Sequence, residues 1–265
     1  MQIHTQGIEK LRDFLVQSLI EKLSPKGIFE KSLSPSRREE GLDPIQGNLY
    51  GTIPDSIPIL ENGLQFLISI PHGQKTGFFL DQREMRLKIQ SLASTRKVLN
   101  CFAYSGGFSI YALQGNAQSV TSVDGCPKAC QLAEDNSTLN GFINHEVIQS
   151  DVFDFLESTT LDFDLVILDP PAFAKKKNHI KNALKAYQNM NEKVIKNLPK
   201  NSILLTCSCS YFVDENLFKR AVFSAALKAR RFVKILGQHI QAPDHPIALT
   251  HPEGGYLKSL LLFVE

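Results

Sequence analysis

The chain has 265 residues, enough for one large domain with an appendage or for two small domains. Its hydrophobic fraction is 43%, but no apolar run approaches bilayer length and the N-terminus has no signal-peptide pattern, so we expect a cytoplasmic protein with no membrane association. The net charge of +2 is too small to indicate a nucleic-acid partner by itself, and five cysteines without a C-x-x-C pair disfavour a zinc site or a secreted disulfide framework.

The first 70 residues predict a small α+β subdomain. Apolar residues at spacings of three and four between residues 7 and 23 predict an amphipathic helix that faces a core and ends at Ser24-Pro25. Short β-type runs follow at 28–30 and 64–70, separated by turn residues and a charged stretch. We therefore place a domain boundary near residue 71, between a subdomain over 1–70 and a main domain over 71–265.

The segment 71–83, PHGQKTGFFLDQR, mixes glycines, polar groups and aromatics just before the main sheet. Such a segment can lie across a bound cofactor, with Asp81, Gln82 and Arg83 supplying polar contacts. A connecting hairpin with solvated ends explains the same pattern equally well. The residues 86–93 that follow predict a helix leading into the next strand.

Residues 97–124 read as strand, glycine turn, helix, strand and acid, which is typical of one unit of a doubly wound α/β sheet. In the turn, Ser105-Gly106-Gly107 lets a ligand approach the backbone and the helix N-terminus, and Asp124 can accept both hydroxyls of a ribose. The turn is not G-x-G-x-x-G, so a nucleoside without pyrophosphate, such as S-adenosylmethionine, fits better than a dinucleotide. A turn that merely reverses the chain is the alternative.

Beyond residue 124 helices and strands alternate, as a mostly parallel sheet requires. The predicted helices are 127–140, 183–198 and 217–230, and the predicted strands are 145–148, 163–168, 202–206, 232–236 and 259–264, the last antiparallel near the edge. Asp151 and Val152 can bond an adenine amine and cover its ring, while Asp151 can also cap the following helix. The loop over 241–255 carries histidines and acids, but their spacing matches no metal motif, so we expect no metal.

Two of these strands end in residues whose side chains could bind a substrate or take part in catalysis. The strand over 163–168 ends in Asp169-Pro170-Pro171-Ala172-Phe173, a stiff loop that sets a carboxylate beside an aromatic ring and suits a planar base. Lys175-Lys176-Lys177 follow, either as phosphate contacts or as a solvated face. The strand over 202–206 delivers Cys207 and Cys209 to the same edge, where a positive environment would make a thiol an attacking thiolate. Cysteine is often only a small buried residue.

With Asp214-Glu215-Asn216, these motifs resemble class I S-adenosylmethionine-dependent RNA (cytosine-5) methyltransferases, and most of all the bacterial type that acts on large-subunit ribosomal RNA. Segments 72–83, 244–246 and 252–258 also look like that family, so the similarity covers roughly residues 27 to 265. The resemblance implies a Rossmann-like α/β fold with a seven-stranded, mostly parallel sheet and a small N-terminal α+β subdomain. It also implies S-adenosylmethionine as cofactor and RNA, of ribosomal type, as partner; the oligomeric state stays open, with a homodimer as one candidate.

The resemblance further implies a covalent mechanism. Its Cys-Ser pattern, followed by Glu-Asn, places the nucleophile on Cys209 rather than Cys207. The thiolate would add to carbon 6 of cytosine, Asp169 would contact the ring, and carbon 5 would then take the methyl group. The alternative is an amine methyltransferase that acts on a nucleobase or another planar substrate without a thiolate.

The resulting site assignments are as follows. The cofactor is assigned to Gln82, Arg83, Phe102, Tyr104, Ser105, Gly106, Gly107, Asp124, Asp151, Val152, Asp169 and Pro170, and the substrate to Pro171, Phe173, Lys175, Lys176 and Lys177. Two departures from the family stand out. Its members usually begin with an additional RNA-binding domain, so RNA recognition is expected from residues 27–70, the lysine cluster or a partner. No second cysteine follows the Asp-Pro-Pro loop, which leaves the proton-removing base unassigned.

Overall fold

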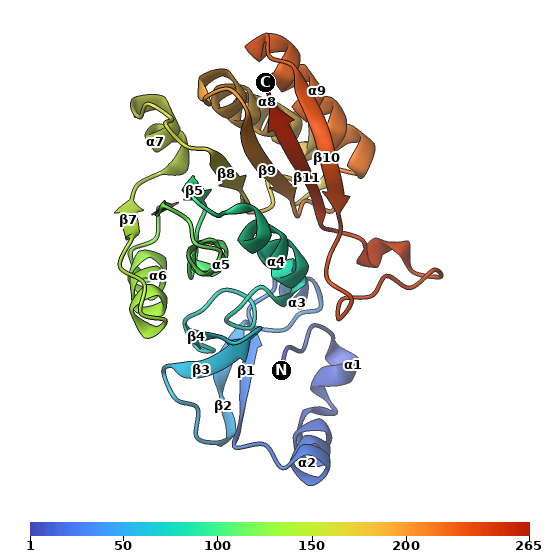
Figure 1. Cartoon of the computed structure of the whole chain (residues 1–265). Helices are drawn as coiled ribbons and strands as arrows, with labels where there is room; N and C mark the ends of the chain where they lie inside the picture. Colours follow the sequence, from blue (N-terminus) through green and yellow to red (C-terminus); the bar gives the residue numbers. More distant parts are fainter. The chain divides into compact units, whose positions relative to one another are not determined.

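The computed structural model describes residues 1–265, and the chain divides into two compact units. The first unit comprises Met1–Ile59 and Leu67–Phe78, and the second comprises Leu60–Phe66 and Phe79–Glu265. Figure 1 labels the elements of both. No helix combines the length and the apolar character needed to cross a membrane.

The first unit holds α1 (Gln6–Glu9), α2 (Arg12–Leu23), α3 (Pro35–Glu39) and the antiparallel strands β1 (Gly27–Ser32) and β2 (Ile45–Gly51). The paired strands β3 (Ile57–Glu61) and β4 (Leu64–Ile68) contribute residues to both units.

The expectation of a single helix over 7–23 that faces a core is wrong. The segment forms two helices, α1 and α2, and neither contains a buried residue. Ion pairs connect these helices to the rest of the unit. Arg12 of α2 lies 3.3 Å from Glu30 of β1, and Arg37 of α3 lies 2.8 Å from Glu9 of α1. The apolar spacing therefore predicted helical structure but not burial: Phe14 keeps 69% of its surface exposed.

The second unit is built on a seven-stranded sheet in the order β10-β11-β9-β8-β5-β6-β7. Its strands are β5 (Lys97–Cys101), β6 (Ser119–Asp124), β7 (His145–Gln149), β8 (Leu165–Leu168), β9 (Ser202–Ser208), β10 (Val233–His239) and β11 (Lys258–Val264). Only β11 runs antiparallel to its neighbours. The predicted Rossmann-like, mostly parallel sheet with a late antiparallel strand is confirmed.

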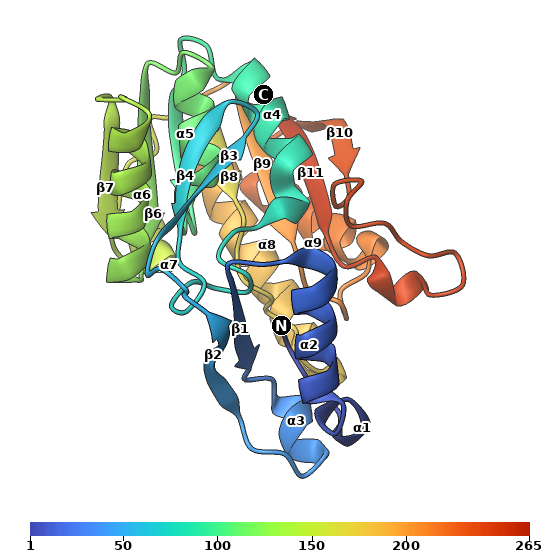
Figure 2. The same ribbon diagram turned by 90° about the horizontal axis from the view of Figure 1, so that it is seen from below.

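Six helices flank this sheet: α4 (Arg83–Leu92), α5 (Gly107–Gln114), α6 (Pro127–Leu139), α7 (Val152–Ser158), α8 (Ile180–Asn197) and α9 (Glu215–Ala229). Figure 2 shows α4 on one face and α8 on the other. Every residue of β8 and β9 is buried, as expected for central strands covered on both faces. An apolar core cluster packs residues of α7, α8 and α9 against β8, β9 and β11.

Strand direction decides which loops meet. The carboxyl ends of the parallel strands β5, β6, β8, β9 and β10 share one edge of the sheet. Because β11 is antiparallel, it starts at that edge: Lys258 pairs with Ser208, and Ser259 pairs with both Cys207 and His239. The loop between β10 and β11 therefore lies at the same edge as the glycine turn and the Asp-Pro-Pro loop.

A buried chain of hydrogen bonds fastens α5 to the sheet. Asn100 donates to Ser109 at 2.8 Å, the hydroxyls of Ser109 and Ser122 lie 2.6 Å apart, and Ser122 lies 2.7 Å from Nε2 of His145. Burial lowers the pKa of His145 to about 4. The ring is therefore neutral at physiological pH and can serve the hydroxyl chain without a charge.

Acidification should destabilise the protein through His145. Its ordinary pKa of 6.5 is lowered to about 4 in the folded state, so between these values the unfolded chain binds the proton and the folded chain does not. The free energy of unfolding should fall by roughly 2–3 kcal/mol as the pH drops from about 6.5 to about 4. Urea titrations across this range would show the slope, and it should largely vanish in His145→Gln. An identical slope in both proteins would assign the loss to other groups.

Candidate active site

The turn between β5 and α5 is held in an uncommon backbone conformation. Phe102, Tyr104 and Gly106 have positive φ values of 59°, 48° and 74°. Non-glycine residues seldom adopt this region, and such strain clusters at ligand-binding sites. At Gly106 a Cβ atom would also lie 3.1 Å from the Cβ of Ala133, so both conformation and space require glycine there.

Asp124, at the end of β6, is tied to this turn. One carboxylate oxygen accepts the backbone N–H of Tyr104 and the other accepts that of Cys126, both at 2.9 Å. Each carboxylate oxygen can accept more than one hydrogen bond, so the acid remains able to receive ribose hydroxyls. Asp124 therefore holds the turn between β5 and α5 in place, as the sequence pattern predicted that the two would lie together.

Neighbouring residues surround the turn between β5 and α5. Ser105 is buried, and its carbonyl accepts a 2.9 Å bond from Asn136 of α6, which the sequence analysis did not single out. Gly107 begins α5, whose first N–H groups are directed to the turn. Phe102 packs edge-on against Phe153, with ring centroids 6.3 Å apart.

Asp151 is the N-cap of α7. Its Oδ1 atom accepts the N–H groups of Phe153 at 2.8 Å and Asp154 at 3.2 Å, so the capping role is confirmed. The cap occupies one oxygen, so a bond from an adenine amine remains a compatible prediction. Val152 is buried in the apolar cluster beneath the loop.

Gln82 and Arg83 have different surroundings. Gln82 keeps only 3% of its surface exposed, and its side-chain amide interacts with the buried Cys207 thiol. Arg83 instead donates to Asp244 at 2.7 Å and to Glu84 at 3.2 Å, an ion pair absent from the sequence-based assignment.

The loop after β10 is bound to the segment before α4. The backbone oxygen of Asp81 accepts the N–H of Ala242 at 2.9 Å, and its side chain accepts the hydroxyl of Tyr256 at 2.5 Å. Burial raises the pKa of Tyr256 above its usual range. Two segments that lie about 160 to 175 positions apart therefore form one side of the site.

The thiol of Cys209 lies beside the Asp-Pro-Pro loop. Asp169 directly follows β8, and Cys209 follows the parallel neighbour β9. The Cys209 sulfur donates to the carbonyl oxygen of Pro170 at 3.6 Å. Carboxylate, prolines and thiol therefore meet at the edge that carries the glycine turn.

The two cysteines of β9 and its end differ in environment. Cys207 has no exposed surface, and burial holds its thiol pKa well above the usual value. Cys209 is partly exposed. Only Cys209 combines access with proximity to the loop, which supports the choice of this residue as the nucleophile.

A buried tyrosine joins the two loops. The hydroxyl of Tyr187, on α8, lies 2.9 Å from that of Ser208 and 3.0 Å from that of Ser210, the neighbours of Cys209 in sequence. Ser210 in turn accepts the N–H of Ala174 at 3.1 Å. Burial raises the pKa of Tyr187 to about 12, so it stays a neutral donor. The helix predicted over 183–198 gave no sign of this role.

The residues assigned to the substrate occupy different positions. Pro171 is exposed, whereas the Phe173 ring is partly buried against Tyr187, with centroids 4.7 Å apart. Lys175, Lys176 and Lys177 are all exposed directly after the loop.

The comparison with family models gives one match. The S-adenosylmethionine-dependent methyltransferase family matches residues 43–251. The chain belongs to this family.

Relatives of the methyltransferase agree with the assignment. Proteins named ribosomal RNA large subunit methyltransferase I from Alteromonas mediterranea and Aeromonas salmonicida are each 40% identical to it, over 98% of this chain and 67% of theirs. A solved structure from Streptococcus mutans, described as a SAM-dependent methyltransferase, superposes with a TM-score of 0.85 at 25% identity, covering 99% of this chain and 68% of the other. Another, with the same score and identity, was crystallised with SAH.

S-adenosylmethionine is the cofactor, and the residues at the sheet edge fit it. The positive-φ turn at Gly106 opens the backbone, and Asp124 offers a fixed carboxylate. These groups suit the amino-acid and ribose parts of a nucleoside ligand without needing a phosphate site.

Removing the Tyr187 hydroxyl should slow the methyltransferase more than it destabilises it. In Tyr187→Phe, Ser208 and Ser210 lose their common partner, and we expect a loss of about 1–2 kcal/mol in stability with roughly a tenfold lower kcat. Tyr111→Phe is the matched control, because its buried hydroxyl bonds Glu61 at 2.9 Å instead. Equal losses of kcat in the two variants would refute a role for Tyr187 in positioning Cys209.

Proposed function

We propose that this methyltransferase methylates carbon 5 of a cytosine in large-subunit ribosomal RNA through a covalent adduct with Cys209. The observation that carries the proposal is the partly exposed Cys209 thiol, 3.6 Å from the carbonyl oxygen of Pro170 in the loop that begins at Asp169. The relatives named as large-subunit ribosomal RNA methyltransferases support the choice of RNA. The region over 1–70 is proposed to contact RNA.

The chemistry requires a nucleophile because carbon 5 of cytosine is unreactive by itself. The Cys209 thiolate forms a bond to carbon 6, which breaks the double bond between carbons 5 and 6 and places its electron pair on carbon 5. S-adenosylmethionine, when bound, would supply the methyl group that carbon 5 takes up; the bond from this methyl group to the sulfonium sulfur would break, and S-adenosylhomocysteine would leave. Once the proton leaves carbon 5, the bond between Cys209 and carbon 6 breaks, which restores the ring double bond and the thiolate.

The other residues orient the base. Asp169 would bond the exocyclic amine and ring nitrogen and so stabilise charge that develops on the ring. Phe173 offers an aromatic surface near the same loop, and the exposed lysines 175–177 suit backbone phosphates. The target cytosine must be unstacked or single-stranded to enter.

The test is incubation of the protein with methyl-labelled S-adenosylmethionine and total RNA from cells that lack the gene. After digestion, the label should appear as 5-methylcytidine in the large ribosomal RNA. Label on an amine nitrogen would favour direct attack on the methyl group without a thiolate. Absence of 5-methylcytidine in every RNA fraction would contradict the proposal.

A further inference from the structure

Lys258 is a buried cation at the edge of the sheet that carries Cys209. It is the first residue of β11, pairs with Ser208 of the neighbouring strand β9, and keeps only 8% of its surface exposed. Its ammonium donates to the carbonyl oxygens of Ser210 at 2.8 Å and Tyr256 at 2.7 Å. The charge is therefore fixed against the residue that follows Cys209.

This lysine is held at an energetic cost. Both hydrogen bonds go to neutral carbonyls, and burial lowers the pKa of Lys258 to about 8, while ionised Cys209 and Asp214 act in the opposite direction. Buried lysines without a bonded carboxylate are rare, and strongly perturbed cations tend to occur where their charge is used.

The ionisable groups around Cys209 differ in the sign of the charge that they can carry. The groups that interact electrostatically with Cys209 include Tyr187, Cys207, Tyr256 and Lys258. Three of the four would add negative charge on ionisation, and nearby Asp169 and Asp214 are also acids. Among the four, Lys258 alone is a cation and can favour a thiolate.

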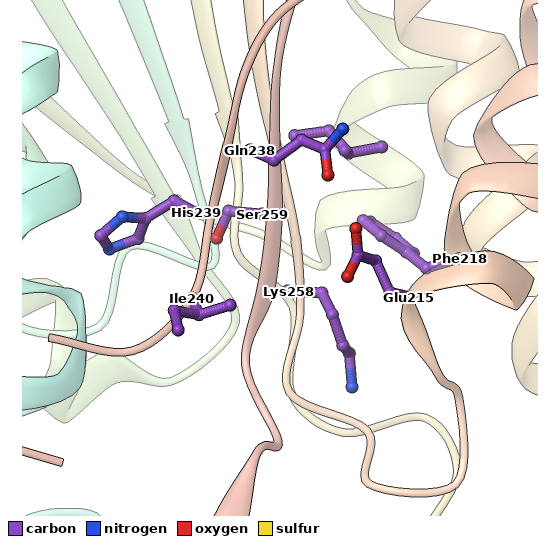
Figure 3. Close-up of a pocket in the computed structure, with 8 residues that line it drawn as sticks. Glu215, Phe218, Gln238, His239, Ile240, Lys258 and Ser259 are labelled. Atoms are coloured by element: carbon purple, nitrogen blue, oxygen red, sulfur yellow. The ribbon is translucent and has the colours of Figure 1, made fainter. Parts of the chain in front are cut away.

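The lysine also borders a cavity. The cavity has a volume of about 200 Å³ and is lined by residues of α9, β10 and β11, among them Glu215, His239 and Lys258. Figure 3 shows Lys258 and Glu215 along this cavity. Glu215 is therefore a further acid to consider when the pH response of this region is measured.

We propose that Lys258 is a positioning residue whose fixed positive charge holds Cys209 as a thiolate before it adds to the substrate. The inference rests on the proposed role of Cys209 as the nucleophile. On ionisation the S–H bond breaks, its electron pair remains on sulfur, and the proton passes to water. The carbonyls of Ser210 and Tyr256 keep the ammonium in place throughout.

The test is the rate of Cys209 alkylation by iodoacetamide between about pH 6 and about pH 10, followed by fragment-resolved mass spectrometry. In Lys258→Met the midpoint of the profile should move upward by about one pH unit, with a roughly tenfold lower rate near pH 7. Lys258→Arg should restore most of the shift. Lys234→Met, which removes an exposed lysine of the adjacent strand β10, should leave the profile unchanged.

Identical midpoints in wild type, Lys258→Met and Lys258→Arg would overturn the inference. Thermal melts and calorimetric binding of S-adenosylmethionine report whether each variant is folded. If the methionine variant does not fold, Lys258→Gln supplies an uncharged side chain that can still donate to a carbonyl. The readout needs no RNA, so its failure is distinguishable from failure of the proposed reaction, which the nucleoside analysis tests separately.

Discussion

Cys209→Ser should abolish methyl transfer to RNA, with kcat lowered by roughly 10³-fold or more. A serine hydroxyl stays protonated where a thiol ionises, so it cannot add to carbon 6 of the base. The neighbouring Cys207 cannot replace it as the nucleophile, because Cys207 is fully buried and its pKa is raised. Transfer of labelled methyl groups into RNA under single-turnover conditions would measure the loss.

Cys207→Ser is the matched control for this experiment. It makes the same chemical change two residues away, in the interior of β9, and should leave most of the activity intact. Binding of S-adenosylmethionine should be similar in both variants. Full turnover by Cys209→Ser would contradict the covalent mechanism and would support direct attack by a substrate amine.

Asp124→Ala should weaken S-adenosylmethionine binding by roughly 100-fold, as measured by calorimetry. Hydrogen bonds to a charged group contribute about 1.5–3 kcal/mol, and this carboxylate is expected to accept ribose hydroxyls. It also accepts the N–H of Tyr104 at 2.9 Å, so its removal releases a turn whose residues have positive φ. Both effects act in the same direction.

Two further variants show whether the effect belongs to the carboxylate. Asp124→Asn keeps one acceptor and should bind with intermediate affinity. Asp164→Ala removes a carboxylate that accepts the N–H of Lys97 at 2.9 Å at the opposite edge of the sheet, and it should chiefly lower stability, by about 1 kcal/mol. Wild-type affinity in Asp124→Ala would remove this residue from the cofactor site.

Much of the fold could be predicted because its signals are local. The apolar run over 163–168 and the glycine turn at 105–107 each reflect contacts within a few residues, and the structure has a strand and a helix start there. The helix over 7–23 shows the limit of this reasoning. Its spacing correctly indicated helical structure, but burial depends on what lies opposite, and Phe14 remained exposed.

The sequence by itself determined the order of helices and strands, the sheet edge that carries the chemistry, and the pair of cysteines among which a nucleophile had to be sought. Tertiary structure alone placed the Cys209 thiol against Pro170, joined both loops through Tyr187, and brought Lys258 to the same edge. The reason is physical: periodicity and turn chemistry depend on neighbours in the chain. The protonation of a thiol depends instead on burial and charge, which come from residues about 20 to 50 positions away.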